Sequence, residues 1–139
     1  MKVEKSAGAI IFRDENGKRK YLLLHYSVGH WEYVKGHIEN NETPRQTVKR
    51  ETIEETGIKD LVFIPDFKED IQWYFKHNEQ LIKKFVVFFL AETKTEAVNL
   101  GSDEHIGYAW LPYDKAIEKV TYKSSKDVLK KAEKFLEKK

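Results

Sequence analysis

The chain contains no cysteine, so disulfide bonds, thiolate metal ligands and cysteine nucleophiles are excluded at once. Any metal ion bound here needs oxygen or imidazole ligands. Neither sign of charge dominates: 25 Lys and Arg residues face 23 Asp and Glu residues, and the net charge of +2 is too small to indicate nucleic-acid binding. No apolar run is long enough to span a bilayer, and the N-terminus lacks the pattern of a secretory signal. We therefore expect a soluble, cytoplasmic protein without a membrane partner.

What the sequence does contain suits one globular domain. Its 139 residues match the size of an ordinary domain, and 40% hydrophobic with 13% aromatic residues are enough to build a core. Neither a low-complexity linker nor an internal repeat divides the chain. We therefore predict a single domain over residues 1–139, acting as a monomer.

Runs of strand-forming residues alternate with turn residues. Residues 6–13 and 20–26 flank a turn that contains Asn16 and Gly17, which predicts a hairpin. By the same criteria further strands are predicted over residues 60–64, 68–76, 81–93 and 107–111, with residues 77–80 as the turn between the second and third of these.

The clearest helix is predicted over residues 43–56. Thr43 and Gln46 have the spacing of a capping box, Pro44 takes the first helical position, and Gly57 suits a left-handed C-cap. This segment therefore carries both a start and a stop signal.

A second helix is predicted near the C-terminus, where Ser124 and Asp127 have the spacing of another capping box. It would pack through one apolar stripe, made of Val128, Leu129, Ala132, Phe135 and Leu136. Strands combined with two segregated helices indicate an α+β layered domain with a mixed sheet.

The first helix carries three glutamates on one face. Glu51, Glu54 and Glu55 repel one another at this spacing, and Arg50 supplies a single positive charge. Hard oxygen ligands of this kind suit Mg²⁺ or Mn²⁺, which also bridge to substrate phosphates. A plain charged surface is the alternative, because such clusters are common on solvated helices.

A wider pattern favours the metal site. Residues 36–58 read GHIENNETPRQTVKRETIEETGI, which resembles the signature of the Nudix hydrolases. The matching positions are Gly36, Glu42, Arg50, Glu51, Glu54, Glu55, Gly57 and Ile58. One position departs, because Thr52 stands where the pattern has an aliphatic residue. We expect its hydroxyl to bond to the preceding turn at a small cost in stability.

The resemblance implies an αβα sandwich with a mixed sheet, and an enzyme that hydrolyses nucleoside diphosphates linked to another group by water attack on phosphorus. It further implies that Mg²⁺ or Mn²⁺ is held by Glu51, Glu54, Glu55 and the carbonyl of Lys35.

Two further roles follow from the same resemblance. Arg50 is expected to orient the catalytic carboxylates, among them Glu54, by pairing with Glu42. The general base is expected to be Glu51 or Glu104, and Glu104 is also a candidate metal ligand, although a solvated acid in a loop is the alternative.

Outside the signature, the chain is similar to one branch of the family, the asymmetrical dinucleoside tetraphosphatases, which cut diadenosine tetraphosphate into ATP and AMP. The similar segments are residues 6–13, 31–39, 67–74, 83–92 and 102–116. Val34 departs from the proline of many relatives, which bears on the rigidity of its loop.

Such a substrate needs flat surfaces for adenine and cations for phosphate. Trp73 and Tyr74 face opposite sides of one strand, so only one of them is a candidate adenine platform, with core packing as the alternative. Lys84 interrupts an apolar strand and is a candidate phosphate ligand, unless it protects an edge strand.

Beside the metal loop, His37 and Lys35 are the other candidate substrate ligands, whereas His25 and His77 are expected to be structural or exposed.

Other functions stay open. A Nudix enzyme could instead act on capped RNA, a diphosphoinositol phosphate, ADP-ribose or an oxidised nucleotide, although RNA would call for a basic track that the small net charge does not favour. A non-catalytic nucleotide sensor would carry a degenerate signature, whereas every carboxylate is present here. A purely structural protein would require the signature to be a coincidence.

Overall fold

The computed structural model describes residues 1–138, in which eight strands and three helices form one mixed sheet covered on both faces. The strands are β1 (Lys2–Glu15), β2 (Lys18–Tyr26), β3 (Trp31–Glu32), β4 (Val34–His37), β5 (Val62–Phe63), β6 (Glu69–His77), β7 (Gln80–Glu92) and β8 (His105–Leu111). The helices are α1 (Pro44–Thr56), α2 (Tyr113–Lys119) and α3 (Lys123–Glu137). None of these helices is long and apolar enough to cross a membrane.

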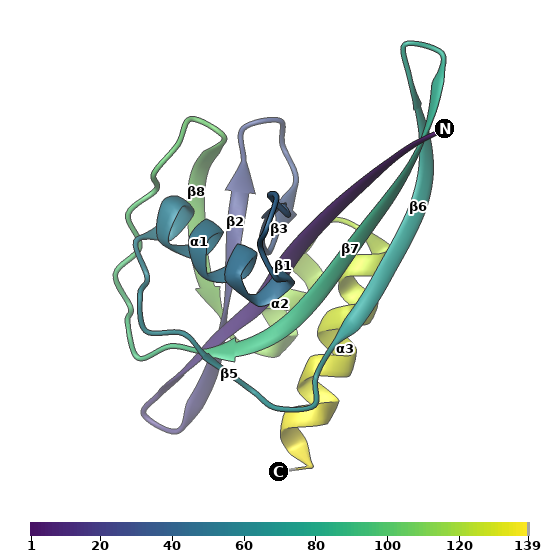
Figure 1. Cartoon of the computed structure of the whole chain (residues 1–139). Helices are drawn as coiled ribbons and strands as arrows, with labels where there is room; N and C mark the ends of the chain where they lie inside the picture. The colour runs from purple at the N-terminus through teal and green to yellow at the C-terminus, as the bar shows by residue number, and fades with distance from the viewer. Residues whose placement is uncertain (139) are drawn as a thin grey trace.

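The sheet has the order β3-β2-β1-β7-β5, with β8 paired to β2, β4 to β1 and β6 to β7. Only β1 and β7 run parallel to each other, and the other pairs are antiparallel. Figure 1 shows α1 on one face of the sheet, with α2 and α3 on the other. This arrangement confirms the predicted α+β sandwich with a mixed sheet.

Strand alternation divides the core into two layers. On β1, Ile10 and Phe12 pack toward α2 and α3, whereas Ala9 and Ile11 pack toward Val48 of α1. Successive side chains of a strand point to opposite faces, so β1 supplies apolar residues to both layers. The signature helix is therefore fixed to the middle of the sheet.

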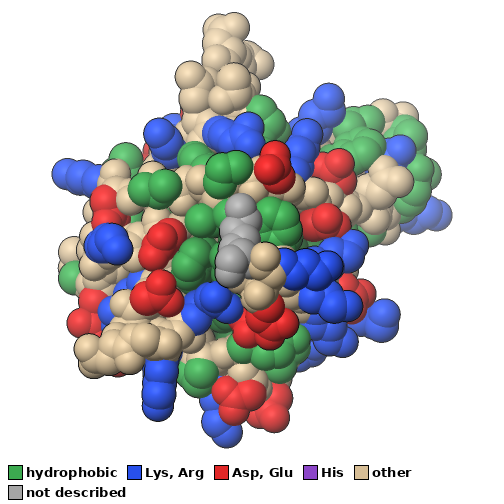
Figure 2. Space-filling model, turned by 90° about the horizontal axis from the view of Figure 1, so that it is seen from below, with side chains coloured by type: hydrophobic (Ala, Val, Ile, Leu, Met, Phe, Trp, Pro, Cys, Tyr) green, Lys and Arg blue, Asp and Glu red, His purple; other side chains and the backbone are tan. Residues whose placement is uncertain are grey.

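The hairpin predicted around Asn16 and Gly17 is confirmed by the register of β1 and β2, and the turn predicted over residues 77–80 joins β6 to β7. These two strands form a long hairpin that extends beyond the rest of the sheet (Figure 1). Seen from the end where the C-terminus lies, Figure 2 shows basic, acidic and hydrophobic side chains interspersed over the surface.

The C-terminal helix does not begin as the sequence predicted. Ser124 lies inside α3 rather than at its N-cap, which is Tyr122, and no side chain caps this end. The neighbouring Ser125 is buried and donates its hydroxyl to Glu32 at 2.6 Å, so tertiary contacts define this helix start. The apolar stripe is confirmed, since Val128, Leu129, Ala132 and Leu136 are buried.

Two further features were not predicted. The helix α2 has seven residues and no side-chain cap, and the acidic Asp114 lies in its first turn. Residues 31–37 contain the short strands β3 and β4 instead of a loop. Val34 is buried and pairs with Ala9 of β1. Strand pairing therefore holds this segment in place.

Candidate active site

The helix α1 is held at both ends by the residues that predicted it. The hydroxyl of Thr43 accepts the backbone N–H of Gln46, and the Gln46 side chain accepts the backbone N–H of Thr43. Gly57 has φ of 78° at the C-cap. Thr52 is fully buried and donates its hydroxyl to the carbonyl of Val48 at 2.6 Å, as expected of a threonine in place of an aliphatic residue.

Strand β4 lies so close to α1 that no side chain fits between them at Gly36. A Cβ on this residue would overlap the Glu51 side chain. The signature glycine thus lets the backbone of β4 approach the first carboxylate of the cluster, which places the segment of Lys35 and Gly36 beside it.

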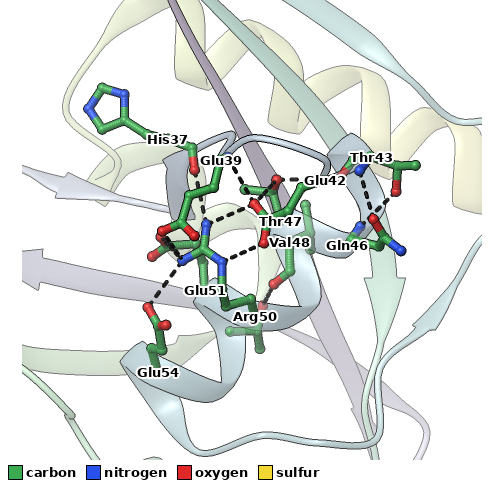
Figure 3. A network of polar contacts seen from close by, with 11 residues as sticks. His37, Glu39, Glu42, Thr43, Gln46, Thr47, Val48, Arg50, Glu51 and Glu54 are labelled. Carbon is green, nitrogen blue, oxygen red and sulfur yellow. Dashed lines mark hydrogen bonds and ion pairs between the residues drawn. The ribbon is translucent and has the colours of Figure 1, made fainter.

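Arg50 is the centre of the polar network in Figure 3. Its guanidinium donates from Nε to Glu42 Oε2 at 2.6 Å and from Nη1 to Glu51 Oε1 at 2.8 Å and to Glu54 Oε2 at 3.3 Å. The Nη2 group also donates to the carbonyl of His37 at 3.0 Å. The predicted pairing of Arg50 with Glu42 is therefore present, and Arg50 also connects the metal loop to two of the three helix glutamates.

This network shifts the pKa values of its members. Hydrogen bonds from Arg50 lower the pKa of Glu42 from its ordinary 4.5 to about 2. Conversely, the hydrogen bond with Glu42, together with Glu51, raises the pKa of Arg50. Both groups are thus firmly ionised, so the ion pair persists at any physiological pH.

Glu55 differs from the other carboxylates because it is buried. Burial raises its pKa, and a hydrogen bond with Glu51 and the negative charges of Glu51, Glu104 and Glu54 raise it further. One of its oxygens, Oε1, has no hydrogen-bond partner among residues 1–138. Nε2 of His105 lies 3.3 Å from this oxygen, and burial lowers the pKa of the histidine.

Glu104 reaches the site on the loop before β8. Its backbone carbonyl accepts the N–H of Ser27 at 2.8 Å, while its side chain is exposed. The same loop is tied to the end of α1, because Asn99 N–H donates to the carbonyl of Thr56 at 2.9 Å. At Gly101 a Cβ would overlap the carbonyl oxygen of Glu54, so a glycine is needed for this approach.

The donor set fits a hard divalent cation in its chemistry. Glu51, Glu54 and Glu55 supply only oxygen, and the unpaired Oε1 together with the raised pKa of Glu55 marks a carboxyl group that lacks positive charge nearby. Within residues 1–138, no three acidic or histidine side chains already converge as a metal site. Arg50 instead holds Glu51 and Glu54, so the carboxylates stand in an arginine-bound arrangement.

A cavity of about 570 Å³ lies on the opposite face of the sheet, between β6 and the start of α3. Its lining residues are His30, Glu32, Lys35, Ile71, Gln72, Trp73, Val86, Phe88, Tyr122, Ser124 and Ser125. Lys35 is adjacent in sequence to Gly36, which contacts Glu51. The charges of His30 and Glu104 also act on each other. Lys35 of the cavity wall is therefore next in sequence to the glycine that contacts the carboxylate cluster.

The cavity distinguishes between the predicted aromatic residues. Trp73 lines it and is 39% exposed, whereas Tyr74 does not line it, is 55% exposed, and lies 5.6 Å from the Nζ of Lys83. Two aromatic residues that the sequence did not single out, His30 and Tyr122, complete this wall with ring centroids 5.5 Å apart. Each has one signal in the sequence: His30 directly precedes the segment 31–39, and Tyr122 lies two residues before the predicted helix start at Ser124.

Two candidate phosphate ligands have different surroundings. Lys84 lies on β7, which is paired on both sides, so the alternative of an edge-strand protector is wrong. Its Nζ donates to Ser6 Oγ at 2.9 Å, and burial lowers its pKa, with the charge of Lys35 close enough to contribute. The imidazole of His37 is exposed and points away from the carboxylates in Figure 3. His25 stacks on Trp31, and His77 is exposed in the hairpin, as expected.

The sequence profile of the NUDIX domain matches residues 3–132, which is most of the chain. The chain therefore belongs to the Nudix family, and it is a Nudix pyrophosphohydrolase, an enzyme acting on acid anhydrides.

Within that family, the chain is 36% identical over 143 residues to the asymmetrical bis(5'-nucleosyl)-tetraphosphatase of Sus scrofa, with 95% of each chain covered. The corresponding protein of Mus musculus is 34% identical with the same coverage. Among solved structures, the crystal structure of a C. elegans Ap4A hydrolase binary complex has a TM-score of 0.85 at 31% identity, and the match covers 98% of this chain and 99% of that chain. The similarity thus extends over nearly the whole length of each relative.

Proposed function

We propose that the protein hydrolyses diadenosine tetraphosphate to ATP and AMP by metal-dependent attack of water on a phosphorus atom. The observation that carries the proposal is that Lys35, which lines a cavity with aromatic walls, directly precedes Gly36, which contacts the carboxylate cluster on α1. A dinucleoside polyphosphate needs both parts, since its phosphates need cations and its base needs a flat surface. The tetraphosphatase relatives, which match over nearly their full length, support the same substrate.

Glu51, Glu54 and Glu55 would hold Mg²⁺ or Mn²⁺, with Glu104 and the carbonyl of Lys35 as further ligands. When bound, the cation would neutralise phosphate oxygens and lower the pKa of a coordinated water. The burial of Glu55 beside the negative charges of Glu51, Glu54 and Glu104, which a cation would offset, supports this role.

The chain's own residues would then position the reactants. Arg50 keeps Glu51 and Glu54 close to the metal loop through its bonds to Glu42 and the carbonyl of His37. Glu51 or Glu104 would remove the proton of the attacking water. Glu104 has an exposed carboxylate on a fixed loop, which suits a base that must reach solvent.

On the substrate side, Trp73 is the better adenine platform of the two predicted aromatic residues because it lines the cavity and Tyr74 does not. Lys35 lines the same cavity, and Lys84 lies close enough for their charges to interact. These two lysines would bind the phosphate chain as it leaves the cavity for the carboxylates. His37 has the weaker claim, because its ring points away from them.

A labelled-water experiment tests this proposal. The purified protein is incubated with diadenosine tetraphosphate and Mg²⁺ in ¹⁸O-labelled water. The nucleotides are then separated, and their masses are measured by mass spectrometry. We expect equal amounts of ATP and AMP with label in one of them, and loss of most activity in Glu54→Gln. Two ADP molecules would refute asymmetrical cleavage, and binding without cleavage would indicate a sensor.

Two further variants separate the candidate bases. If Glu104 is the base, Glu104→Gln lowers kcat far more than the affinity for Mg²⁺, whereas Glu51→Gln lowers both. Trp73→Ala is expected to raise KM, with Tyr74→Ala as its matched control on the other face of β6. Equal effects of Trp73→Ala and Tyr74→Ala on KM would contradict the assignment of the cavity.

A further inference from the structure

His105 and Glu55 form a buried pair where the end of α1 meets the start of β8. The Nε2 atom of His105 lies 3.3 Å from Oε1 of Glu55, and the two side chains are 0% and 6% exposed. Neither ring nitrogen of His105 nor Glu55 Oε1 has a hydrogen-bond partner within residues 1–138, and their 3.3 Å contact does not itself meet the geometry of a hydrogen bond. Buried polar atoms almost always have a partner, so each is the natural partner of the other.

A β-bulge directs the His105 side chain to this position. The register between β2 and β8 shifts after His25, which pairs with Gly107, so that Tyr26 pairs with His105 and Ile106 is left unpaired. Ile106 is consequently 62% exposed, while His105 is buried. Bulges commonly redirect a side chain next to an active site.

Tyr26 fixes the orientation of the imidazole ring. The two rings meet edge-on, with centroids 4.3 Å apart and an interplanar angle of 68°. Tyr26 is itself held, because its hydroxyl donates to the carbonyl of Tyr33 at 3.0 Å. The imidazole is therefore packed between the ring of Tyr26 and the carboxyl group of Glu55.

We propose that His105 is a positioning residue for the metal site. With the cation bound, its Nε2–H would donate to Oε1 of Glu55 and would leave the other oxygen of this carboxylate for the metal. The inference rests on the proposed function, because the direction of Glu55 matters only if Glu55 is a ligand. Partners that hold a ligating side chain typically change metal affinity by about 10- to 100-fold when they are removed.

A packing role alone does not account for this residue. An apolar side chain would fill the space between Tyr26 and Glu55 without burying two polar nitrogens, and burying unpaired nitrogens is unfavourable. Direct ligation by His105 is also disfavoured, because hard cations such as Mg²⁺ prefer oxygen and the ring already faces a carboxylate oxygen.

Metal titration of three variants, without substrate, tests the inference. His105→Gln keeps an amide N–H that reaches as far as Nε2, His105→Asn keeps an amide that is too short, and His105→Leu keeps bulk but no donor. The dissociation constant for Mn²⁺ is measured from the electron paramagnetic resonance signal of the free ion. We expect His105→Leu and His105→Asn to raise the dissociation constant for Mn²⁺ at least tenfold. In His105→Gln it should stay within about threefold of the value for the unaltered protein.

Thermal unfolding in EDTA serves as the control for folding, and the Asn variant substitutes for the Leu variant if the latter does not fold. Unchanged Mn²⁺ affinity in His105→Leu or His105→Asn would overturn the inference, as would a Gln variant as weak as these. The proposed function is tested in the same titration, because absence of Mn²⁺ binding by the unaltered protein, rather than by the variants alone, would overturn the metal site itself.

Discussion

Arg50 shows how much one residue contributes at the smallest scale. Its guanidinium contacts the carboxylates of Glu42, Glu51 and Glu54, and thereby compensates part of their mutual repulsion. Lysine has its three donors on one nitrogen and no planar fork, so it could not reproduce the separate contacts that Nε and Nη1 make to these carboxylates. The requirement for arginine at this position of the signature thus has a geometric cause.

Acid titration tests the pair of Arg50 and Glu42. Its contribution to stability is present above 4.5, the ordinary pKa of Glu42, and is lost as the pH falls toward about 2. Glu42→Gln is therefore expected to lower the free energy of unfolding at neutral pH, and its difference from the unaltered protein should shrink on acidification. Urea unfolding at a series of pH values measures this. Glu39→Gln is the control, since Glu39 is 65% exposed and 3.6 Å from Arg50. A difference that does not vary with pH would contradict the assignment.

Thr52 offers a second test at this scale. Thr52→Val keeps the shape of the buried side chain, removes its bond to Val48, and restores the aliphatic residue of the signature. Because the carbonyl of Val48 lies in a helix and keeps its backbone partner, we expect the free energy of unfolding to change by less than about 1 kcal/mol, with unchanged kcat. Thr52→Ala, which leaves a cavity, should be the less stable variant. Loss of activity in Thr52→Val at unchanged stability would show that the hydroxyl has a chemical role.

At the scale of elements, the sequence predicted best what local signals determine. The helix α1 begins and ends where Thr43 and Gly57 indicated, because caps act within one turn. The spacing of Ser124 and Asp127 predicted the wrong helix start for the same reason. It imitates a local cap, but Asp127 instead lies 3.6 Å from Lys123, and contacts with Glu32 set the start of α3. Such contacts join residues far apart in sequence and leave no local pattern.

The loop from residue 99 to residue 104 provides a prediction for an element. Gly101→Ala would place a methyl group against the backbone of Glu54, which has no freedom to move aside, so the loop must shift. We expect a loss of about 1–3 kcal/mol in stability and lower activity, because Glu104 moves with the loop. Gly107→Ala is the matched control, since its Cβ would lie 3.7 Å from His25 in ordinary contact. Equal effects of the two substitutions in urea unfolding and in activity would contradict this account.

For the whole molecule, the important feature is that the site draws on both faces of the sheet. The carboxylates come from α1 and the loop before β8, whereas the cavity lies between β6 and the start of α3 on the other face. The sequence offered Trp73 or Tyr74 as an adenine platform but missed His30 and Tyr122, because 92 residues separate those two rings and neither carries a motif. Whether two distant residues line the same cavity is determined by the fold and leaves no pattern in the sequence.

Adding Mg²⁺ tests the molecule as a whole, because a ligand of the folded state stabilises every part of it. At a concentration about 100 times the dissociation constant, the free energy of unfolding should rise by about 2.7 kcal/mol. Glu55→Gln should instead be more stable than the unaltered protein without Mg²⁺, since it removes a buried carboxyl group beside Glu51, and should gain less when Mg²⁺ is added. Urea unfolding with and without Mg²⁺ measures both changes in the free energy of unfolding. A Glu55→Gln variant that is less stable without Mg²⁺ would refute the role given to repulsion.

The hydrogen bond between Asn99 and Thr56 has a consequence for how such an enzyme could change during evolution. It joins the loop of Glu104 to α1, so the acidic groups of the two segments form one connected unit. The residues around Trp73 and Tyr122 belong to other elements and are free to be exchanged without disturbing that unit. New substrates could therefore be acquired by replacing one wall of the cavity while the catalytic half of the molecule stays as it is.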